Sequence, residues 1–209
     1  MRYLTTAILG LAIFLRIVSS SSAELSESIV DASMHGDIAK IRELLALGAE
    51  SNTAHADGMT GLHWSAKNNH DEIIALLVTA GGSTDAVTRI GAHTPLHVAS
   101  KFGSAKAIKE LLLAGSNVNA LTTTGATPLH FAASSGNPES IALLLEHGAS
   151  LDSKEPQWGQ TPLMFAAAAG RTEAVNILLE RGADPRITAL VIDVVKRNKI
   201  DQAERRNRN

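Results

Sequence analysis

The sequence predicts an all-α solenoid, in which about six copies of one helix pair stack side by side. Three observations carry this prediction. A Thr-led motif recurs along the chain, glycines recur in two further series with the same spacing, and the apolar residues are almost all aliphatic. Apolar residues make up 44% of the 209 residues and aromatic residues only 3%, so the interior must be filled by small repetitive contacts, which suit stacked helices.

The Thr-led motifs mark where the first helix of a repeat begins. They start at Thr60, Thr94, Thr127 and Thr161, at steps of 34, 33 and 34 residues, and all but the first continue with Pro. Thr is a good helix N-cap, and Pro is favoured at the first helical position because its missing N–H would have no partner there. Each motif therefore predicts the start of a helix of about nine residues.

Two glycine series mark where the helices end. The first series ends the first helices, since Gly and Asn accept the left-handed conformation at a helix C-terminus. It consists of Gly36, Asn69, Gly103, Gly136 and Gly170. A second, apolar helix is predicted after each of these residues, and it stops at a second series, which consists of Gly48, Gly81, Gly115, Gly148 and Gly182.

The segments between the second glycine and the next Thr are polar and rich in turn-forming residues. They hold eleven or twelve residues, which predicts an extended finger or hairpin and not a third helix. Two of them carry one extra residue, around 91–93 and around 156–158. We expect these two fingers to be bulged.

The recurring Thr-Pro-Leu-His motif, with its period near 33, resembles the ankyrin repeat over about residues 26–186. The resemblance implies an antiparallel helix pair per repeat, a β-hairpin finger at right angles to it, and a slightly curved array with a concave groove. Two positions depart from the motif, because Gly61 replaces Pro and Met164 replaces His. The first change should weaken a helix start, and the second removes a hydrogen-bonding ring.

The predicted domain organisation has three parts. Residues 1–23 form a signal peptide, residues 24–198 form the ankyrin repeat domain, and residues 199–209 form a basic, frayed tail. The repeats are expected at about 26–58, 59–91, 92–125, 126–159 and 160–186, followed by a shortened C-terminal cap at 187–203. The outer copies are degenerate, as terminal repeats are when nothing stacks beyond them.

The first 23 residues have the pattern of an export signal. Arg2 supplies the positive start, residues 4–15 form the apolar run, and Ser21 and Ala23 are the small residues of a cleavage site. Arg16 cuts the apolar run to about half of the roughly 20 residues that a membrane-spanning helix needs. We therefore expect a periplasmic or secreted protein. The alternative is a protein anchored in the membrane by an uncleaved N-terminal segment.

Composition excludes several chemistries. The chain has no Cys, which excludes disulfides, a thiolate nucleophile and a thiolate zinc site. The net charge is −2, and it is divided between an acidic body and a basic end. Residues 24–195 hold 11 basic and 19 acidic side chains, whereas residues 196–209 hold 6 basic and 2 acidic ones. We expect no nucleic-acid partner, and no membrane contact beyond the export signal.

Three motif histidines could in principle bind a metal ion, but their spacing excludes a shared site. They lie one per repeat, so equivalent atoms should be roughly 10 Å apart, whereas the ligands of one zinc ion all lie about 2 Å from it. The family resemblance implies a structural role instead, in which each imidazole ties the Thr turn to a finger. The residues given this structural role are Thr60, His63, Thr94, His97, Thr127, His130 and Thr161.

Catalytic signatures are not found in the sequence. Carboxylate pairs such as Asp152 and Glu155 lie on predicted loops, where such residues are usually solubilising charge. The chain has no phosphate-binding glycine loop, no Gly-x-Ser-x-Gly elbow and no His-Glu-x-x-His motif. We therefore expect no enzyme activity and no cofactor. A metal-binding or enzymatic protein on a repeat scaffold is the alternative.

The predicted function is that of a non-catalytic protein-binding module or scaffold, which acts as a monomer outside the cytoplasm. By the resemblance, fingertips and the exposed positions before each helix-ending glycine line the groove and contact the partner protein. Several of these side chains are apolar or aromatic, as is typical of interfaces. The predicted contact residues are Met59, Lys67, Arg89, Ile90, Lys101, Phe102, Leu121, Trp158 and Gln160. A membrane-tethered scaffold is the alternative.

Overall fold

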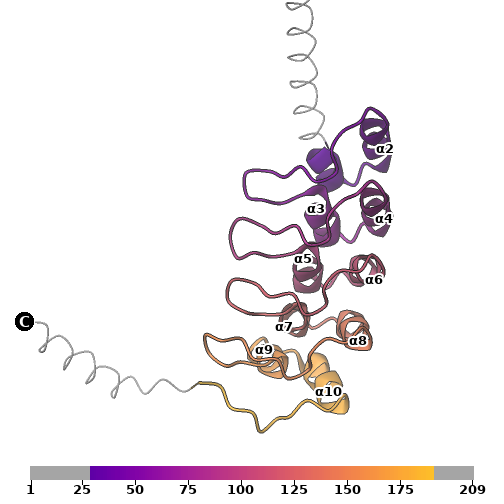
Figure 1. Ribbon diagram of the computed structural model, residues 1–209. Coiled ribbons are helices and arrows are strands. Elements are labelled where there is room, and N and C mark those ends of the chain that lie inside the picture. The colour runs from indigo at the N-terminus through magenta and orange to yellow at the C-terminus, as the bar shows by residue number, and fades with distance from the viewer. Residues whose placement is uncertain (1–28, 191–209) are drawn as a thin grey trace, which may run out of the picture.

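The computed structural model describes residues 29–190. The signal peptide expected at 1–23, the part of the C-terminal cap beyond residue 190 and the basic tail at 199–209 lie outside the described residues. Residues 29–35 are helical and lie beside the first fully described helix (Figure 1). The fully described helices are α2 (Ile38–Ala46), α3 (Gly61–Lys67), α4 (Asp71–Thr79), α5 (Pro95–Phe102), α6 (Ala105–Leu113), α7 (Pro128–Ser135), α8 (Pro138–Glu146), α9 (Pro162–Ala168) and α10 (Thr172–Glu180).

The helices form two parallel columns, with one helix of each repeat in each column (Figure 1). Helices α3, α5, α7 and α9 contact one another in sequence order along the first column, and α2, α4, α6, α8 and α10 form the second. The long loops between repeats, which we call the fingers, all project on the side of the first column. This confirms the predicted all-helical repeat solenoid.

The helix starts lie where the Thr-led motifs predict them. Thr94 is the N-cap of α5, its side chain accepts from the backbone N–H of His97, and Pro95 is the first helical residue. The first helices have seven or eight residues instead of nine, because they end before the left-handed residue. Gly103 takes that role after α5 with φ +66°, and a Cβ there would lie 3.0 Å from the Cβ of Asn137 in the next repeat.

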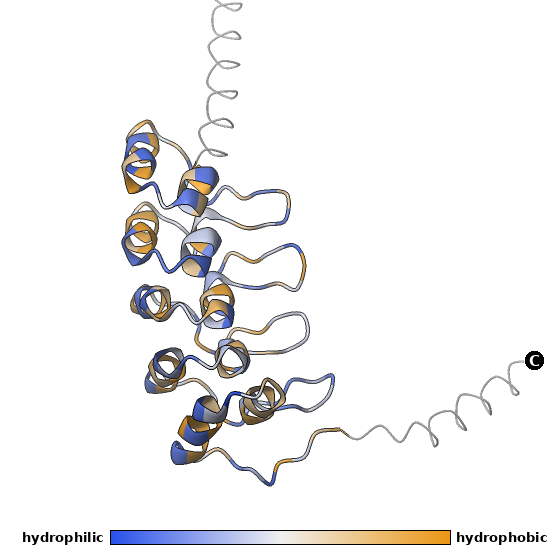
Figure 2. Cartoon of the chain, turned by 180° about the vertical axis from the view of Figure 1, so that it is seen from behind, coloured by the Kyte–Doolittle hydropathy of each residue, from blue (hydrophilic) through white to orange (hydrophobic). Residues whose placement is uncertain are grey.

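The core runs without interruption through the stack between the two columns. Its largest fully buried side chains are repeated Leu and Ile residues, joined by small Ala side chains such as Ala66, Ala99 and Ala132. Figure 2 shows hydrophobic and hydrophilic stretches side by side in both columns, as expected of helices that bury one face. Within residues 29–190, no helix combines the length and the apolar character that a membrane crossing requires.

The fingers differ in one respect from the hairpins that the family resemblance implies. Residues 29–190 contain no β-strand, and the single isolated β-bridge joins Ala54 and Thr60. The finger of residues 49–60 is closed by the bond from His55 N to Met59 O at 3.0 Å. The finger of residues 82–94 is likewise closed by the bond from Thr88 N to His93 O at 3.0 Å. One closing bond of this kind per finger is too few to form a β-ladder.

The two expected bulges are confirmed. The closing bond spans four residues in the finger of 49–60, but five in the finger of 82–94 and in the finger of 149–160, where Glu155 N donates to Gln160 O. In the finger of 82–94, the extra residue produces two consecutive left-handed residues, Gly91 at φ +84° and Ala92 at φ +49°. A non-Gly residue in this region is uncommon, so the turn is held by the contacts around it.

Neighbouring fingers are joined by single main-chain bonds at one register position. Arg89 N donates to Asp57 O at 2.8 Å, Thr123 N to Gly91 O at 3.0 Å, and Leu190 N to Trp158 O at 2.6 Å. The matching residue of the finger of 149–160 is Pro156, which has no N–H to donate. The finger row therefore lacks this bond between its third and fourth members.

Candidate functional site

Each motif histidine is buried and joins two segments of backbone. The Nδ1 atom of His63 accepts from the backbone N–H of Thr60 at 3.1 Å, and its Nε2 lies 2.9 Å from the carbonyl oxygen of His93. His130 makes the same pair of contacts with Thr127 N and Gln160 O, each at 3.1 Å. The carbonyl acceptors lie 30 residues further along the chain, in the finger that leads to the next repeat.

This geometry fixes the protonation state of the histidines. Since Nδ1 faces an N–H donor, the ring proton must be on Nε2, which donates to the carbonyl oxygen. Burial lowers the pKa of His63 and of His130 and lowers that of His97 to about 4. The imidazoles are therefore neutral structural braces at pH 7. Within residues 29–190, no group of three or more His, Cys, Asp or Glu side chains is placed to hold a metal ion.

The two departures from the motif have different structural settings. A Cβ on Gly61 would lie 2.7 Å from the Ser33 hydroxyl and 3.0 Å from the Cδ1 atom of Leu77, so the packing leaves no room for Pro there. At Met164 the backbone N–H still donates to the Thr161 hydroxyl at 3.4 Å, but no ring reaches onward to a finger. The fourth motif is therefore less firmly braced than the other three.

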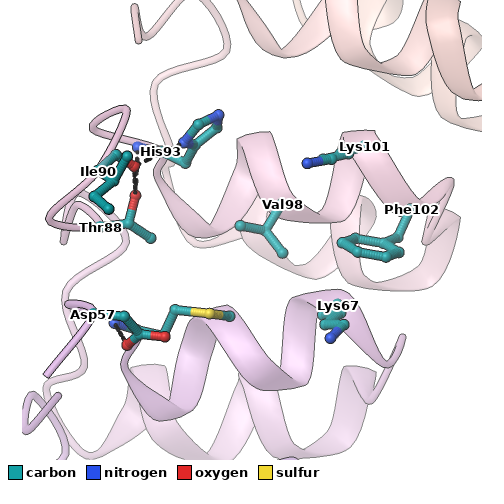
Figure 3. Close-up of a pocket in the computed structure, with 9 residues that line it drawn as sticks. Asp57, Lys67, Thr88, Ile90, His93, Val98, Lys101 and Phe102 are labelled. Carbon is teal, nitrogen blue, oxygen red and sulfur yellow. Dashed lines mark hydrogen bonds between the residues drawn. The ribbon is translucent and has the colours of Figure 1, made fainter. Parts of the chain in front are cut away.

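Five of the nine predicted contact residues surround one hollow, which we call the α3/α5 pocket. It has a volume of about 280 Å³ and lies between α3, α5 and the finger of residues 82–94 (Figure 3). The predicted residues in its wall are Met59, Lys67, Ile90, Lys101 and Phe102. Thr88 and Ile90 lie on the finger side, while Val98, Lys101 and Phe102 follow α5 and Lys67 lies on α3.

The pocket exposes apolar side chains that are not part of the hydrophobic core. Ile90 is 84% exposed and Phe102 is 52% exposed. The Nζ atom of Lys67 lies 5.4 Å from the centre of the Phe102 ring and 4.7 Å from that of Trp64, within the range of cation–π contacts. The finger wall is fixed by Thr88, whose hydroxyl donates to Ile90 O at 2.9 Å and accepts from His93 N at 3.0 Å.

The other four predicted contact residues lie outside this pocket. Gln160 lines a second hollow of about 290 Å³, together with Ser134, Phe165 and the end of α9. Leu121 is 62% exposed and Trp158 is 44% exposed, each on its own finger. Arg89 is exposed, and its backbone N–H joins two fingers. The predicted contact set is therefore spread along the finger side and is not one cluster.

Glu155 was expected to be solubilising charge on a loop, and this expectation is wrong. Its side chain is 3% exposed. The carboxylate accepts from the backbone N–H groups of Gln157, Trp158 and Gln160 at 2.7 to 3.1 Å. The loop turns these donors inward, and the buried carboxylate satisfies all three. Glu155 thus holds the loop that presents Trp158.

The sequence reasoning also missed a row of side chains on the first helices. Trp64, Val98, Phe131 and Phe165 occupy one register position, two residues after the motif Leu. Phe131 packs against His93 and His97 at ring distances of 5.4 and 5.7 Å, and Phe165 against His130 at 5.0 Å. The signal was the recurrence of an apolar residue at that position, where Val98 is buried and the other three are partly buried.

Comparison with known proteins gives the same pattern of repeats. Residues 29–122 and 96–189 match the family model described as ankyrin repeats (3 copies). The chain is 38% identical over 86 residues to the palmitoyltransferase Hip14 of Drosophila melanogaster, which covers 41% of this chain and 14% of that protein. It is 29% identical over 79 residues to ankyrin repeat domain-containing protein 40 of Mus musculus, covering 37% of this chain and 22% of that protein.

A third relative is the tyrosine-protein kinase Shark of Drosophila melanogaster. It is 29% identical over 94 residues, covering 45% of this chain and 10% of the kinase. The chain thus spans less than a quarter of the length of each of these relatives.

Proposed function

Because the chain belongs to the ankyrin repeat family, we propose that it is a non-catalytic module that holds another protein against its fingers and first helices. The observation that carries this proposal is the α3/α5 pocket, where five of the predicted contact residues meet. Its exposed Ile90 and Phe102 side chains lie outside the hydrophobic core, and exposed apolar side chains of this kind are typical of interfaces.

The physical basis of binding is a preformed surface. The pocket wall is fixed by main-chain and side-chain hydrogen bonds around Thr88, and Trp158 is presented by the buried Glu155. A surface whose contact residues are already held in place loses little conformational entropy when a partner binds. The chain itself is proposed to be a monomer that binds a different protein.

Enzyme activity is not part of this proposal. The similarity to palmitoyltransferases and to a tyrosine kinase covers at most 14% of those proteins, so the activities in their names are not transferred to this chain. Ankyrin repeats support protein–protein interaction. The motif histidines His63, His97 and His130 are hydrogen-bonded braces, and Glu155 is satisfied by backbone donors.

Export is proposed from the sequence of residues 1–23, which combines a basic start, an apolar run and a small-residue cleavage site. The partner would then be a periplasmic or extracellular protein. N-terminal sequencing of the protein from its own cells tests this point. A chain that starts at Glu24 is expected, and a chain that keeps Met1 would instead favour a membrane-tethered scaffold.

The binding proposal is tested by affinity capture with the mature chain as bait. A Phe102→Ala/Trp158→Ala variant should lose proteins that the unchanged chain retains. The matched control is Leu47→Ala/Leu113→Ala, which removes two exposed apolar side chains from the ends of second-column helices and should retain them. Equal capture by all three baits would contradict the proposal.

A single Trp158→Ala substitution separates binding from folding. Because Trp158 is 44% exposed and lies outside the core, the melting temperature should hardly change. Affinity for a retained partner should fall by at least about 1 kcal/mol, as for an aromatic interface residue. A large loss of stability with unchanged affinity would reverse the assignment.

A further inference from the structure

The α3/α5 pocket combines an apolar interior with a cationic rim. Met59, Ile90, Val98 and Phe102 supply apolar surface, and Lys67 and Lys101 come from equivalent positions of α3 and α5. At about 280 Å³ the pocket has room for one bulky apolar side chain.

The two lysines have no carboxylate partner in the part of the chain that the structure describes. None of the four salt bridges there involves Lys67 or Lys101. Asp57 also lines the pocket, but it lies at the finger end, where its Oδ1 atom accepts from Met59 N at 2.9 Å, whereas Lys67 and Lys101 lie at the other end (Figure 3). Residues 29–190 hold 11 basic and 16 acidic side chains, so this cationic rim stands out against a net charge of −5.

The fold itself does not require lysine at these positions. The equivalent residues of the other repeats are Met34, Ser134 and Ala168. A cation in the last turn is favourable to the helix dipole, but each of those helices forms without one. Phe102 also has no Phe, Tyr or Trp counterpart at the equivalent positions of the other repeats, which include Asn68, Ser135 and Ala169. The combination of two ammonium groups and one exposed ring occurs in this pocket alone among the described repeats.

We infer that the α3/α5 pocket binds an acidic segment of the partner protein, with a bulky apolar side chain in the pocket and a neighbouring carboxylate on Lys67 and Lys101. This inference rests on the proposed function and specifies its partner. The apolar side chain removes the exposed surface of Ile90 and Phe102 from water. The carboxylate complements two cations that have no acidic partner within the described residues, and like-charged basic segments are excluded by repulsion.

The test uses the full chain labelled with ¹⁵N and three capped peptides, Ac-EEFEE-NH₂, Ac-EEAEE-NH₂ and Ac-KKFKK-NH₂. The first should shift the amide signals of residues 88–93 and 98–102. The second lacks the side chain for the pocket and the third has the opposite charge, so each should bind at least about tenfold more weakly. Raising the salt concentration should weaken the binding of Ac-EEFEE-NH₂.

Charge-reversal variants show whether the rim is responsible. Lys67→Glu/Lys101→Glu should weaken Ac-EEFEE-NH₂ binding at least about tenfold. The matched control Lys106→Glu/Lys109→Glu makes the same change of charge on the exposed face of α6 and should stay within about twofold. Circular dichroism of both variants checks that each is folded.

Three results would overturn the inference. They are the absence of any shift at millimolar Ac-EEFEE-NH₂, equal binding of Ac-KKFKK-NH₂, or equal binding by the two charge-reversal variants. Binding to phosphatidylserine vesicles that is lost in Lys67→Glu/Lys101→Glu, without peptide binding, would assign the rim to lipid headgroups instead. If none of the peptides binds, but capture of a partner protein still depends on Phe102 and Trp158, the inference is wrong and the proposed function stands.

Discussion

The buried imidazole of His97 satisfies polar groups that would otherwise be unpaired in the interior. It accepts from Thr94 N at 3.2 Å and lies 3.1 and 3.2 Å from the carbonyl oxygens of Ala120 and Ala126. A second ring proton would point at the Thr94 N–H, and the ring lies away from water. The fold therefore requires the neutral form of His97, and acid should destabilise the folded protein.

The pH dependence of stability follows from this pKa. The unfolded chain protonates the imidazole below about pH 6.5, whereas the folded chain does so only below about pH 4. The stabilisation is therefore complete above pH 6.5 and is lost as the pH falls toward 4. Between pH 7.5 and 5.0, His97 alone should remove about 2 kcal/mol from the free energy of unfolding.

Urea unfolding at these two pH values tests the assignment. The variant His97→Gln keeps a side-chain N–H donor but cannot be protonated in this range. It should be less stable than the unchanged chain at pH 7.5, and its loss of stability on going to pH 5.0 should be smaller by about 2 kcal/mol. An identical loss in both proteins would contradict the neutral, buried histidine.

Asn69 performs two tasks that a glycine could not combine. It takes the left-handed conformation after α3 with φ +60°, and its Oδ1 atom accepts from Ala107 N at 3.0 Å. That N–H lies in the first turn of α6, whose own N-cap Ser104 makes no side-chain capping bond. The side chain of one repeat therefore caps a helix of the next.

Substitutions at Asn69 should separate these tasks. Asn69→Gly keeps the backbone conformation and loses the cap, so the free energy of unfolding should fall by about 1 kcal/mol. Asn69→Ala loses the cap and also strains the backbone, so it should cost about 1 kcal/mol more. Chemical denaturation measures both values. Stability in Asn69→Gly equal to that of the unchanged chain would show that the cap contributes nothing.

Among the structural elements, the finger of residues 82–94 is held in its conformation by the hydroxyl of one residue, Thr88. Thr88 donates to Ile90 O and accepts from His93 N, and in doing so it spans the left-handed pair Gly91 and Ala92. The finger of 116–127 repeats part of this arrangement, since Thr122 Oγ1 accepts from Ala126 N at 3.1 Å. The longer finger has more backbone to hold, so it should respond more to loss of its hydroxyl.

The variant Thr88→Val keeps the shape of the side chain and removes both hydrogen bonds. Loss of about 1 to 2 kcal/mol is expected in the local stability of the finger. Hydrogen exchange measured by NMR should then show the His93 amide exchanging about tenfold faster or more. The Ala126 amide, held by Thr122, is the internal control and should keep its rate. Unchanged exchange at His93 would contradict the role of the hydroxyl.

The ends of the helices were predictable from local chemistry, because a single residue type fixes the backbone conformation there. Thr caps, Pro at the first helical position and left-handed Gly or Asn fixed the helix ends within a few residues, as at Thr94, Pro95 and Gly103. The fingers were less predictable. Whether a turn-rich segment forms a β-ladder depends on how many bonds close within the finger, and each described finger has too few. The bonds between neighbouring fingers were equally unpredicted, and Pro156 shows how one residue removes such a bond.

The candidate site was predictable only in part for the same reason. Ile90, Lys101 and Phe102 were predicted because they lie on a fingertip or just before a helix-ending glycine, which the family resemblance places on the groove. The extra residue predicts the bulge of the finger of residues 82–94, but which residues of α3 and α5 the finger meets depends on packing between repeats, which local sequence does not specify. Glu155 was misjudged because its burial results from three backbone donors that the loop turns toward it.

At the scale of the whole molecule, the repeats form one stack joined at three levels. The first helices pack in sequence order, the second helices do the same, and the histidines link each motif to the finger that follows. Stability in such an array is approximately a sum over neighbouring repeats. The finger side therefore presents contact residues at fixed spacing, which is the property that the proposed binding function needs.

Hydrogen–deuterium exchange of the chain with and without a captured partner shows whether the finger side is the binding surface. Binding should slow exchange in residues 88–93 and 98–103 and leave the second-column helices α4, α6 and α8 unchanged. It should produce no new protection that would indicate refolding of the array. Protection confined to α4, α6 and α8, with unchanged exchange around Ile90 and Phe102, would contradict the assignment of the finger side as the binding surface.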